Sequence, residues 1–124
     1  MSEEAIRAEF IGKARDGYFR AGKTWSSTHR ANGRSDFSAD GRTWAGHWTL
    51  RGRVLCTFVD PKTLPARPGG CWSAVKVSAN CYEYYVARPG RAETGEDAWT
   101  DQRWFARGWR REQPSTCMET TPIV

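Results

Sequence analysis

Residues 24–59 read TWSSTHRANGRSDFSADGRTWAGHWTLRGRVLCTFV, and this stretch decides the fold. Apolar and polar residues alternate along much of it, which is the period of a half-buried β-strand. Three dipeptides that end in glycine interrupt the alternation: Asn32-Gly33, Asp40-Gly41 and Arg51-Gly52. The first two are typical of type I′ hairpin turns, because both central positions of that turn need a positive φ. The stretch therefore predicts four short strands that form an antiparallel meander.

The residues before this stretch predict a helix. Ser2 is a typical N-cap residue, and two glutamates follow it where carboxylates favour a helix N-terminus. Ile6 and Phe10, four residues apart, begin one apolar stripe. We expect a short amphipathic helix over 3–15, in an N-terminal element that covers 1–17.

The residues after this stretch continue the alternation. Two further strands, over 71–77 and 81–87, form another hairpin, so we expect the meander to cover 23–87. A final element over 98–113 follows neither the strand period nor the helix period, and it is expected to be one or the other. The tail, 114–124, is expected to be irregular.

Length and composition indicate one globular domain. The chain has 124 residues, of which 39% are hydrophobic, and a net charge of +5. It is too short for the large dinucleotide-binding and barrel enzymes, and too apolar for a disordered protein. No apolar run approaches the roughly 20 residues of a membrane helix. We predict a single α+β domain over 1–124, with the N-terminal helix packed on a curved antiparallel β-sheet or small β-barrel of six to seven strands.

The four cysteines bear on the compartment. Cys56, Cys71, Cys81 and Cys117 include no CxxC pair, so their spacing argues against a zinc site. An even number of cysteines in a short chain favours two disulfides in the periplasm or outside the cell. Residues 1–4 contain neither a basic nor an apolar segment of a signal peptide, which favours the cytoplasm instead. The cysteine count and the N-terminal residues thus favour different compartments, and the sequence does not decide between them.

Five short motifs resemble those of a known family. They are Gly22-Lys23-Thr24-Trp25, the run from Phe37 to Arg42, Gly46-His47-Trp48, Leu55-Cys56 and Cys81-Tyr82. About half of the chain is thereby similar to an uncharacterised proteobacterial family of small exported proteins, the domain of unknown function 995. The resemblance implies a fold class and no activity. It also implies a disulfide between Cys56 and Cys81, which leaves Cys71 to pair with Cys117.

Acid–base or metal chemistry would depend on His29 and His47, the two histidines of the chain. His29 lies on the predicted face of Trp25, whereas His47 points away from the tryptophans of its strand. Three carboxylates could join them: Asp36, Asp40 or Glu83. No HxH or HxxxH spacing supports such a site. We therefore predict no catalytic residue, metal or cofactor, and an enzyme that uses His29 or His47 is the third hypothesis.

The leading hypothesis is a non-enzymatic binding module. The alternating strands would gather aromatic side chains on one concave face, which would take a small molecule, a glycan or a protein partner. The candidate residues are Trp25, His29, Trp44, Trp48, Tyr84 and Trp104. The chain would act as a monomer or a homodimer.

The alternative hypothesis is a cytosolic nucleic-acid-binding protein. Residues 20–55 carry seven basic and two acidic residues, so this segment has the same net charge as the whole chain. Arginines interleaved with aromatic residues can contact phosphates while bases stack on the rings. The candidate residues are Arg30, Arg34, Arg42, Arg51 and Arg53.

Overall fold

The structure is a computed structural model that describes residues 1–60, 70–87 and 103–117. Within these ranges, one helix precedes eight strands. The elements are α1 (Glu3–Phe10), β1 (Arg15–Phe19), β2 (Thr24–His29), β3 (Arg34–Ala39), β4 (Arg42–Arg51), β5 (Val54–Val59), β6 (Cys71–Ser78), β7 (Cys81–Val86) and β8 (Ala106–Arg110).

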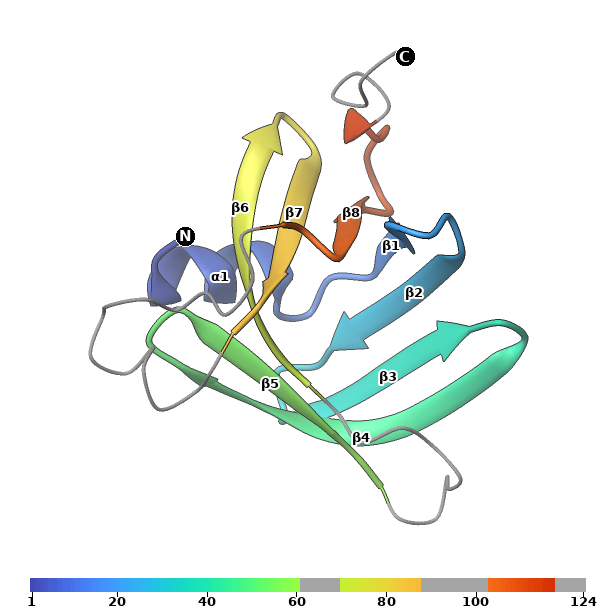
Figure 1. Ribbon diagram of the computed structural model, residues 1–124. Helices are drawn as coiled ribbons and strands as arrows, with labels where there is room; N and C mark the ends of the chain where they lie inside the picture. The colour runs from blue at the N-terminus through green and yellow to red at the C-terminus, as the bar shows by residue number, and fades with distance from the viewer. Residues whose placement is uncertain (61–69, 88–102, 118–124) are drawn as a thin grey trace.

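The eight strands form a closed antiparallel barrel (Figure 1). Each strand pairs with the next along the chain, and β8 closes the barrel by pairing with β1 over the register Arg15↔Arg110 to Phe19↔Ala106. A closed barrel leaves no free strand edge, and it encloses every second side chain of each strand. The buried residues of the main core cluster therefore come from six of the eight strands, β2 and β4 to β8, and from α1.

Helix α1 packs against the barrel through two side chains. Ile6 and Phe10 are both fully buried, whereas the remaining residues of the helix are exposed or half-buried. The Phe10 ring contacts Trp72 of β6 and Tyr82 and Tyr84 of β7, with centroid distances of 5.3–5.7 Å. The amphipathic helix is thus confirmed, with Ser2 as its N-cap, but it ends at Phe10 and not at residue 15 as predicted. No helix in the described ranges is long and apolar enough to cross a bilayer.

The predicted fold class is correct only in outline. A small antiparallel barrel with an N-terminal helix is present, but it has eight strands instead of six or seven, and the protein is mostly β. The strand that was missed is β1, which lies partly inside the N-terminal element predicted over 1–17. The helix ends at Phe10, because Ile11 has extended backbone angles. Arg15 and Gly17 occupy two of the three inward positions of β1, and Phe19 is the one apolar residue among them, so the strand shows no apolar alternation.

The strands of the meander lie where they were predicted, between the predicted turns. Asp40 and Gly41 both have positive φ, 56° and 74°, as a type I′ turn requires. At Asn32-Gly33 the hairpin is confirmed but the type I′ turn is not, since only Gly33 has a positive φ. There the turn is longer, and the amide of Gly33 donates to the carbonyl of Arg30.

The final element predicted over 98–113 contains a strand, β8, although residues 98–102 lie outside the described ranges. In the tail predicted over 114–124, the described residues run to Cys117. Asn80 holds this segment, because its side-chain amide donates to the carbonyls of Arg110, Gln113 and Pro114, each at 3.1 Å. The beginning of the tail is therefore fixed to the β6–β7 turn.

The cysteine pairing implied by the family resemblance is wrong. Two disulfides are present, but they join Cys56 to Cys71 and Cys81 to Cys117. The barrel topology gives the reason. Cys56 and Cys71 are cross-strand partners on β5 and β6, whereas Cys81 begins β7, beside the returning C-terminal segment.

Two glycines make room for Trp25 inside the barrel. A Cβ atom on Gly17 of β1 would lie 2.3 Å from Cζ2 of the indole, and one on Gly108 of β8 would lie 2.7 Å from its Cη2. Such distances are far below van der Waals contact, so a larger residue at either position would displace the ring. The two glycines face each other across the β1–β8 pair, and Trp25 lies over both.

Candidate functional site

Three of the predicted ligand-binding residues lie in the packed core. Trp25, His29 and Tyr84 point into the barrel and are each at most 5% exposed. Tyr84 stacks on Trp72 at 4.6 Å and contacts the ring of Trp25 at 5.5 Å. The concave aromatic face of the sheet is thus the hydrophobic core, where the rings contact one another.

The other three predicted residues are half-buried, and the ring of one of them, Trp48, contacts His29 at 6.4 Å. Trp44 packs against Phe37, with centroids 5.6 Å apart, while the indole of Trp48 donates to the carbonyl of Arg30 at 2.8 Å. Trp104 precedes β8, and its ring lies against the guanidinium groups of two arginines, Arg20 and Arg107, each 4.2 Å from the ring. Four of the six candidates, Trp25, His29, Tyr84 and Trp48, thus lie in the core or pack against it.

A buried cation lies in the middle of this core. Arg15 is fully buried, its Nε donates to the hydroxyl of Tyr84 at 3.1 Å, and its Nη1 donates to the carbonyl of Glu9 at 2.9 Å. Its guanidinium also lies 3.8 Å from the centroid of the Phe10 ring. Burial, with a smaller contribution from this cation, lowers the pKa of His29 to about 4. His29 is therefore neutral in the folded protein at physiological pH.

This neutral histidine predicts a loss of stability in mild acid. The unfolded chain binds a proton at His29 near its ordinary pKa of 6.5, whereas the folded protein binds it only near 4. The stabilising contribution is present above pH 6.5 and is lost as the pH falls toward 4. Between pH 7 and pH 5 we expect the free energy of unfolding to fall by about 2 kcal/mol because of this group. Urea unfolding at both pH values, compared with the His29→Gln variant, measures it; an equal loss in the variant would contradict the assignment.

The two histidines cannot act together. His29 points into the barrel, whereas His47 lies on the outside of β4 and stacks on the exposed Phe58 at 4.9 Å. The carboxylates considered with them are paired elsewhere: Asp36 with Arg30, Asp40 with Lys23, and Glu83 with Arg107. Across the described part of the chain, no group of three His, Cys, Asp or Glu residues is arranged to hold a metal ion.

The arginines of the nucleic-acid hypothesis do not form one patch. Two of them are ion-paired, Arg30 with Asp36 and Arg34 with Asp60, each at 2.7 Å. Arg42 and Arg51 are the first and last residues of β4, so up to about 30 Å of strand separates them. Arg53 lies in the β4–β5 turn, two residues after Arg51.

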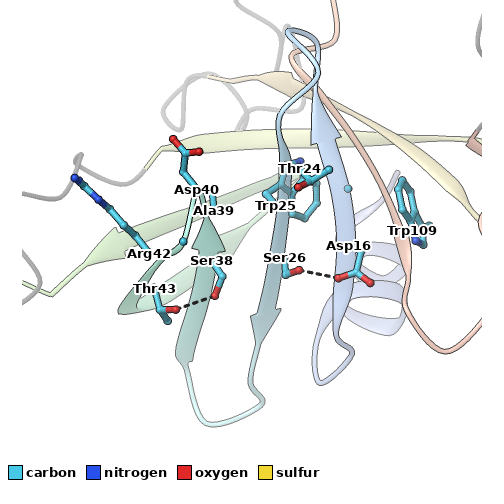
Figure 2. Close-up of a pocket in the computed structure, with 12 residues that line it drawn as sticks. Asp16, Thr24, Trp25, Ser26, Ser38, Ala39, Asp40, Arg42, Thr43 and Trp109 are labelled. Atoms are coloured by element: carbon cyan, nitrogen blue, oxygen red, sulfur yellow. Dashed lines mark hydrogen bonds between the residues drawn. The ribbon is translucent and has the colours of Figure 1, made fainter.

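A different set of residues lines up on the outer surface. Five outward-facing side chains are successive cross-strand partners, one from each of five neighbouring strands. In order from β8 through β1, β2 and β3 to β4, they are Trp109, Asp16, Ser26, Ser38 and Thr43. We call them the outer row. Figure 2 shows the row with its two internal hydrogen bonds, from Ser26 to Asp16 at 2.7 Å and between Ser38 and Thr43 at 3.1 Å.

The outer row lines a shallow hollow of about 460 Å³. Asp40 of the β3–β4 turn and Arg42, the first residue of β4, also line it. A charge-assisted hydrogen bond from Arg111 and a second one from Ser26 outweigh burial and lower the pKa of Asp16, so this side chain is an ionised acceptor. The hollow thus combines one aromatic surface with hydroxyl groups and a carboxylate, all on the rigid wall of the barrel.

Sequence reasoning did not find the outer row. Asp16 was placed in the N-terminal helical element and Trp109 in the ambiguous final element, so neither had a predicted neighbour. The small hydroxyl residues of β2–β4 were visible as the polar half of the alternation, but only the register shows that they form a line. The pairing of β1 with both β2 and β8 places Asp16 between Ser26 and Trp109, and this pairing could not be predicted from the sequence.

Comparison with known proteins gives no match: no family model, no curated protein and no solved structure is significantly similar to the chain. The resemblance to the exported family therefore stays a prediction. The class that the described residues define is a small closed β-barrel whose interior is packed and whose outer wall carries a polar hollow.

Proposed function

We propose that this protein is a non-enzymatic binding module that takes a polyhydroxylated ligand, such as a glycan, in the hollow over the outer row. The observation that carries the proposal is the outer row itself. The half-buried Trp109 stands at one end of the row, and a carboxylate and three hydroxyl groups follow it on the neighbouring strands. Sugar rings offer an apolar C–H face and a rim of hydroxyl groups. An aromatic ring can pack against the first, and fixed polar groups can hydrogen-bond to the second.

The two carboxylates that line the hollow support a binding role over a catalytic one. Asp16, its one carboxylate within the row, has its pKa lowered by Arg111, so it does not hold a proton to donate near neutral pH. The nearby Asp40 lies on the exposed β3–β4 turn and pairs with Lys23 at 3.3 Å. General acid–base catalysis needs one group that holds a proton and another that accepts one. The two carboxylates do not form such a pair, but they can bind and orient a ligand.

The same two carboxylates disfavour the nucleic-acid alternative at this site. A phosphate backbone would meet Asp16 and Asp40 in the hollow, while the arginines of the earlier hypothesis lie on several parts of the surface. Binding to single-stranded DNA or RNA with a strong dependence on salt would favour that alternative and is a separate arm of the test.

We expect oligosaccharide binding to depend on Trp109 and not on Trp104. Both tryptophans are half-buried on the outer surface and both contact Tyr18, at 6.0 and 6.3 Å, but only Trp109 lines the hollow. Trp109→Ala should weaken binding about tenfold because it removes the stacking surface, whereas Trp104→Ala is the matched control. Calorimetric titration with a panel of glucose, galactose, mannose and N-acetylglucosamine oligomers measures the change. Equal losses in the two variants, or no binding of any oligomer, would contradict the proposal.

A further inference from the structure

Three charged residues line the hollow, and they differ in whether an oppositely charged side chain lies beside them. Asp16 has Arg111 as its partner at 2.8 Å, and Asp40 has Lys23 at 3.3 Å. Arg42 is the third charged residue of the lining, it is exposed, and no carboxylate in the described ranges pairs with it. Since the two carboxylates already have cations beside them, the guanidinium of Arg42 leaves the hollow with one uncompensated positive charge.

The position of Arg42 places this charge away from the aromatic end of the hollow. Arg42 begins β4, and Trp109 lies on β8, at the other end of the outer row (Figure 2). Four strand-to-strand steps separate the two, which corresponds to about 19 Å along the surface. Both residues nevertheless line the same hollow. A ligand that reaches both ends must be longer than one sugar ring.

We propose that the hollow selects an acidic oligosaccharide, in which one sugar packs on Trp109 and the carboxylate of another accepts hydrogen bonds from Arg42. This inference rests on the proposed glycan-binding function and adds the ligand class. A guanidinium recognises a carboxylate through two parallel N–H···O bonds, and the hydroxyl groups of Ser26, Ser38 and Thr43 lie between the two ends for the intervening sugars. Asp16 is the cross-strand partner of Trp109 and would repel a carboxylate at that end, so the preferred chain carries its acid group at the Arg42 end.

The test compares two probes that differ at one ionised carboxylate. The first is an oligogalacturonate that is methyl-esterified at every residue except one terminal residue, and the second is the fully methyl-esterified chain, which has no ionised carboxylate. We expect the wild-type protein to bind the acid about tenfold more tightly than the ester. Arg42→Gln should remove this preference, because it weakens binding of the acid about tenfold more than binding of the ester. Arg34→Gln is the matched control, because Arg34 is an exposed arginine on the neighbouring strand β3 that does not line the hollow.

The outcomes separate the two proposals. If the acid and the ester bind equally, or if Arg34→Gln abolishes the preference as completely as Arg42→Gln does, the inference about Arg42 is wrong while glycan binding stands. If neither probe binds and the neutral oligomers do not bind either, the proposed function itself is wrong. Arg42 is exposed at a turn, and circular dichroism of the Arg42→Gln variant should match the wild type, so a lost preference is not a folding defect.

Discussion

Replacing Arg15 with alanine is expected to lower the free energy of unfolding by about 4 kcal/mol. The side chain is fully buried between the rings of Phe10 and Tyr82, with centroids 3.8 and 4.5 Å from the guanidinium carbon. Truncation would open a cavity in the core and would leave the Tyr84 hydroxyl and the Glu9 carbonyl without their donor. Urea unfolding followed by tryptophan fluorescence measures the loss.

A methionine at the same position separates packing from hydrogen bonding. Arg15→Met keeps an unbranched apolar stem between the rings but donates no hydrogen bond, and it also removes the cost of burying a charge. We expect a loss of about 2 kcal/mol, between the wild type and Arg15→Ala. A methionine variant as stable as the wild type would show that the hydrogen bonds to Tyr84 and Glu9 contribute nothing net. An alanine variant that loses less than about 1 kcal/mol would contradict the buried position of Arg15.

Arg15 also explains how the helix is attached to the barrel. The carbonyl of Glu9 belongs to the last turn of α1, where the carbonyl groups have no partner within the helix. Because the C-terminal end of a helix carries a partial negative charge, a guanidinium there is favourable. Arg15 thus connects α1 to β1 and to Tyr84 of β7 at once. Its burial follows from the sharp change from helix to strand between Phe10 and Arg15.

The strands that could be predicted from sequence are those whose inward positions are apolar. In β4, Trp44, Trp48 and Leu50 alternate with polar residues, and glycine dipeptides mark both ends, so local information was sufficient. Strand β1 ends on the apolar Phe19, but its other two inward positions hold Arg15 and Gly17. These residues are determined by tertiary contacts, since one supports the helix and the other accommodates Trp25. The alternation of apolar and polar residues along the sequence does not indicate either contact.

The candidate site was less predictable than the fold for the same reason. Aromatic residues on one face of a strand indicate a buried face, and without the barrel closure it was not possible to separate core from binding surface. Trp25 and Tyr84 proved to be core, whereas Trp109 lines a hollow because β8 pairs with β1. A row of side chains across five strands is a property of register, and register between distant strands cannot be read from alternation alone.

Removing either disulfide is expected to destabilise the barrel, and Cys81–Cys117 should contribute more. Its half-cystines are 36 residues apart, against 15 for Cys56–Cys71. In the chain-entropy account these separations correspond to about 4 and about 3 kcal/mol. The paired variants Cys81→Ser/Cys117→Ser and Cys56→Ser/Cys71→Ser serve as controls for each other. Urea unfolding under non-reducing conditions gives both values, and a larger loss for the Cys56–Cys71 pair would contradict the expected order.

The pairing itself can be tested before any variant is made. Proteolysis without reduction, followed by mass spectrometry, should yield one peptide pair that contains Cys56 with Cys71 and another that contains Cys81 with Cys117. A pair that joins Cys56 to Cys81 would overturn the topology at β5–β6, because Cys56 and Cys71 are cross-strand partners there. Four free thiols in a stable protein would instead show that the barrel closes without either bond.

Removal of each disulfide should also increase local opening in a different part of the barrel. Within the described ranges, β5 and β6 pair at two positions only, Leu55↔Trp72 and Cys56↔Cys71. Loss of this disulfide removes a covalent link at the least extensively paired junction of the barrel, so amide exchange should accelerate first in β5. By contrast, loss of Cys81–Cys117 releases the segment that Asn80 holds by three hydrogen bonds, and exchange should accelerate around β8 and Thr116. Because the outer row runs from β8 to β4, the second variant should weaken ligand binding through Trp109, whereas opening at β5–β6 should leave the hollow intact.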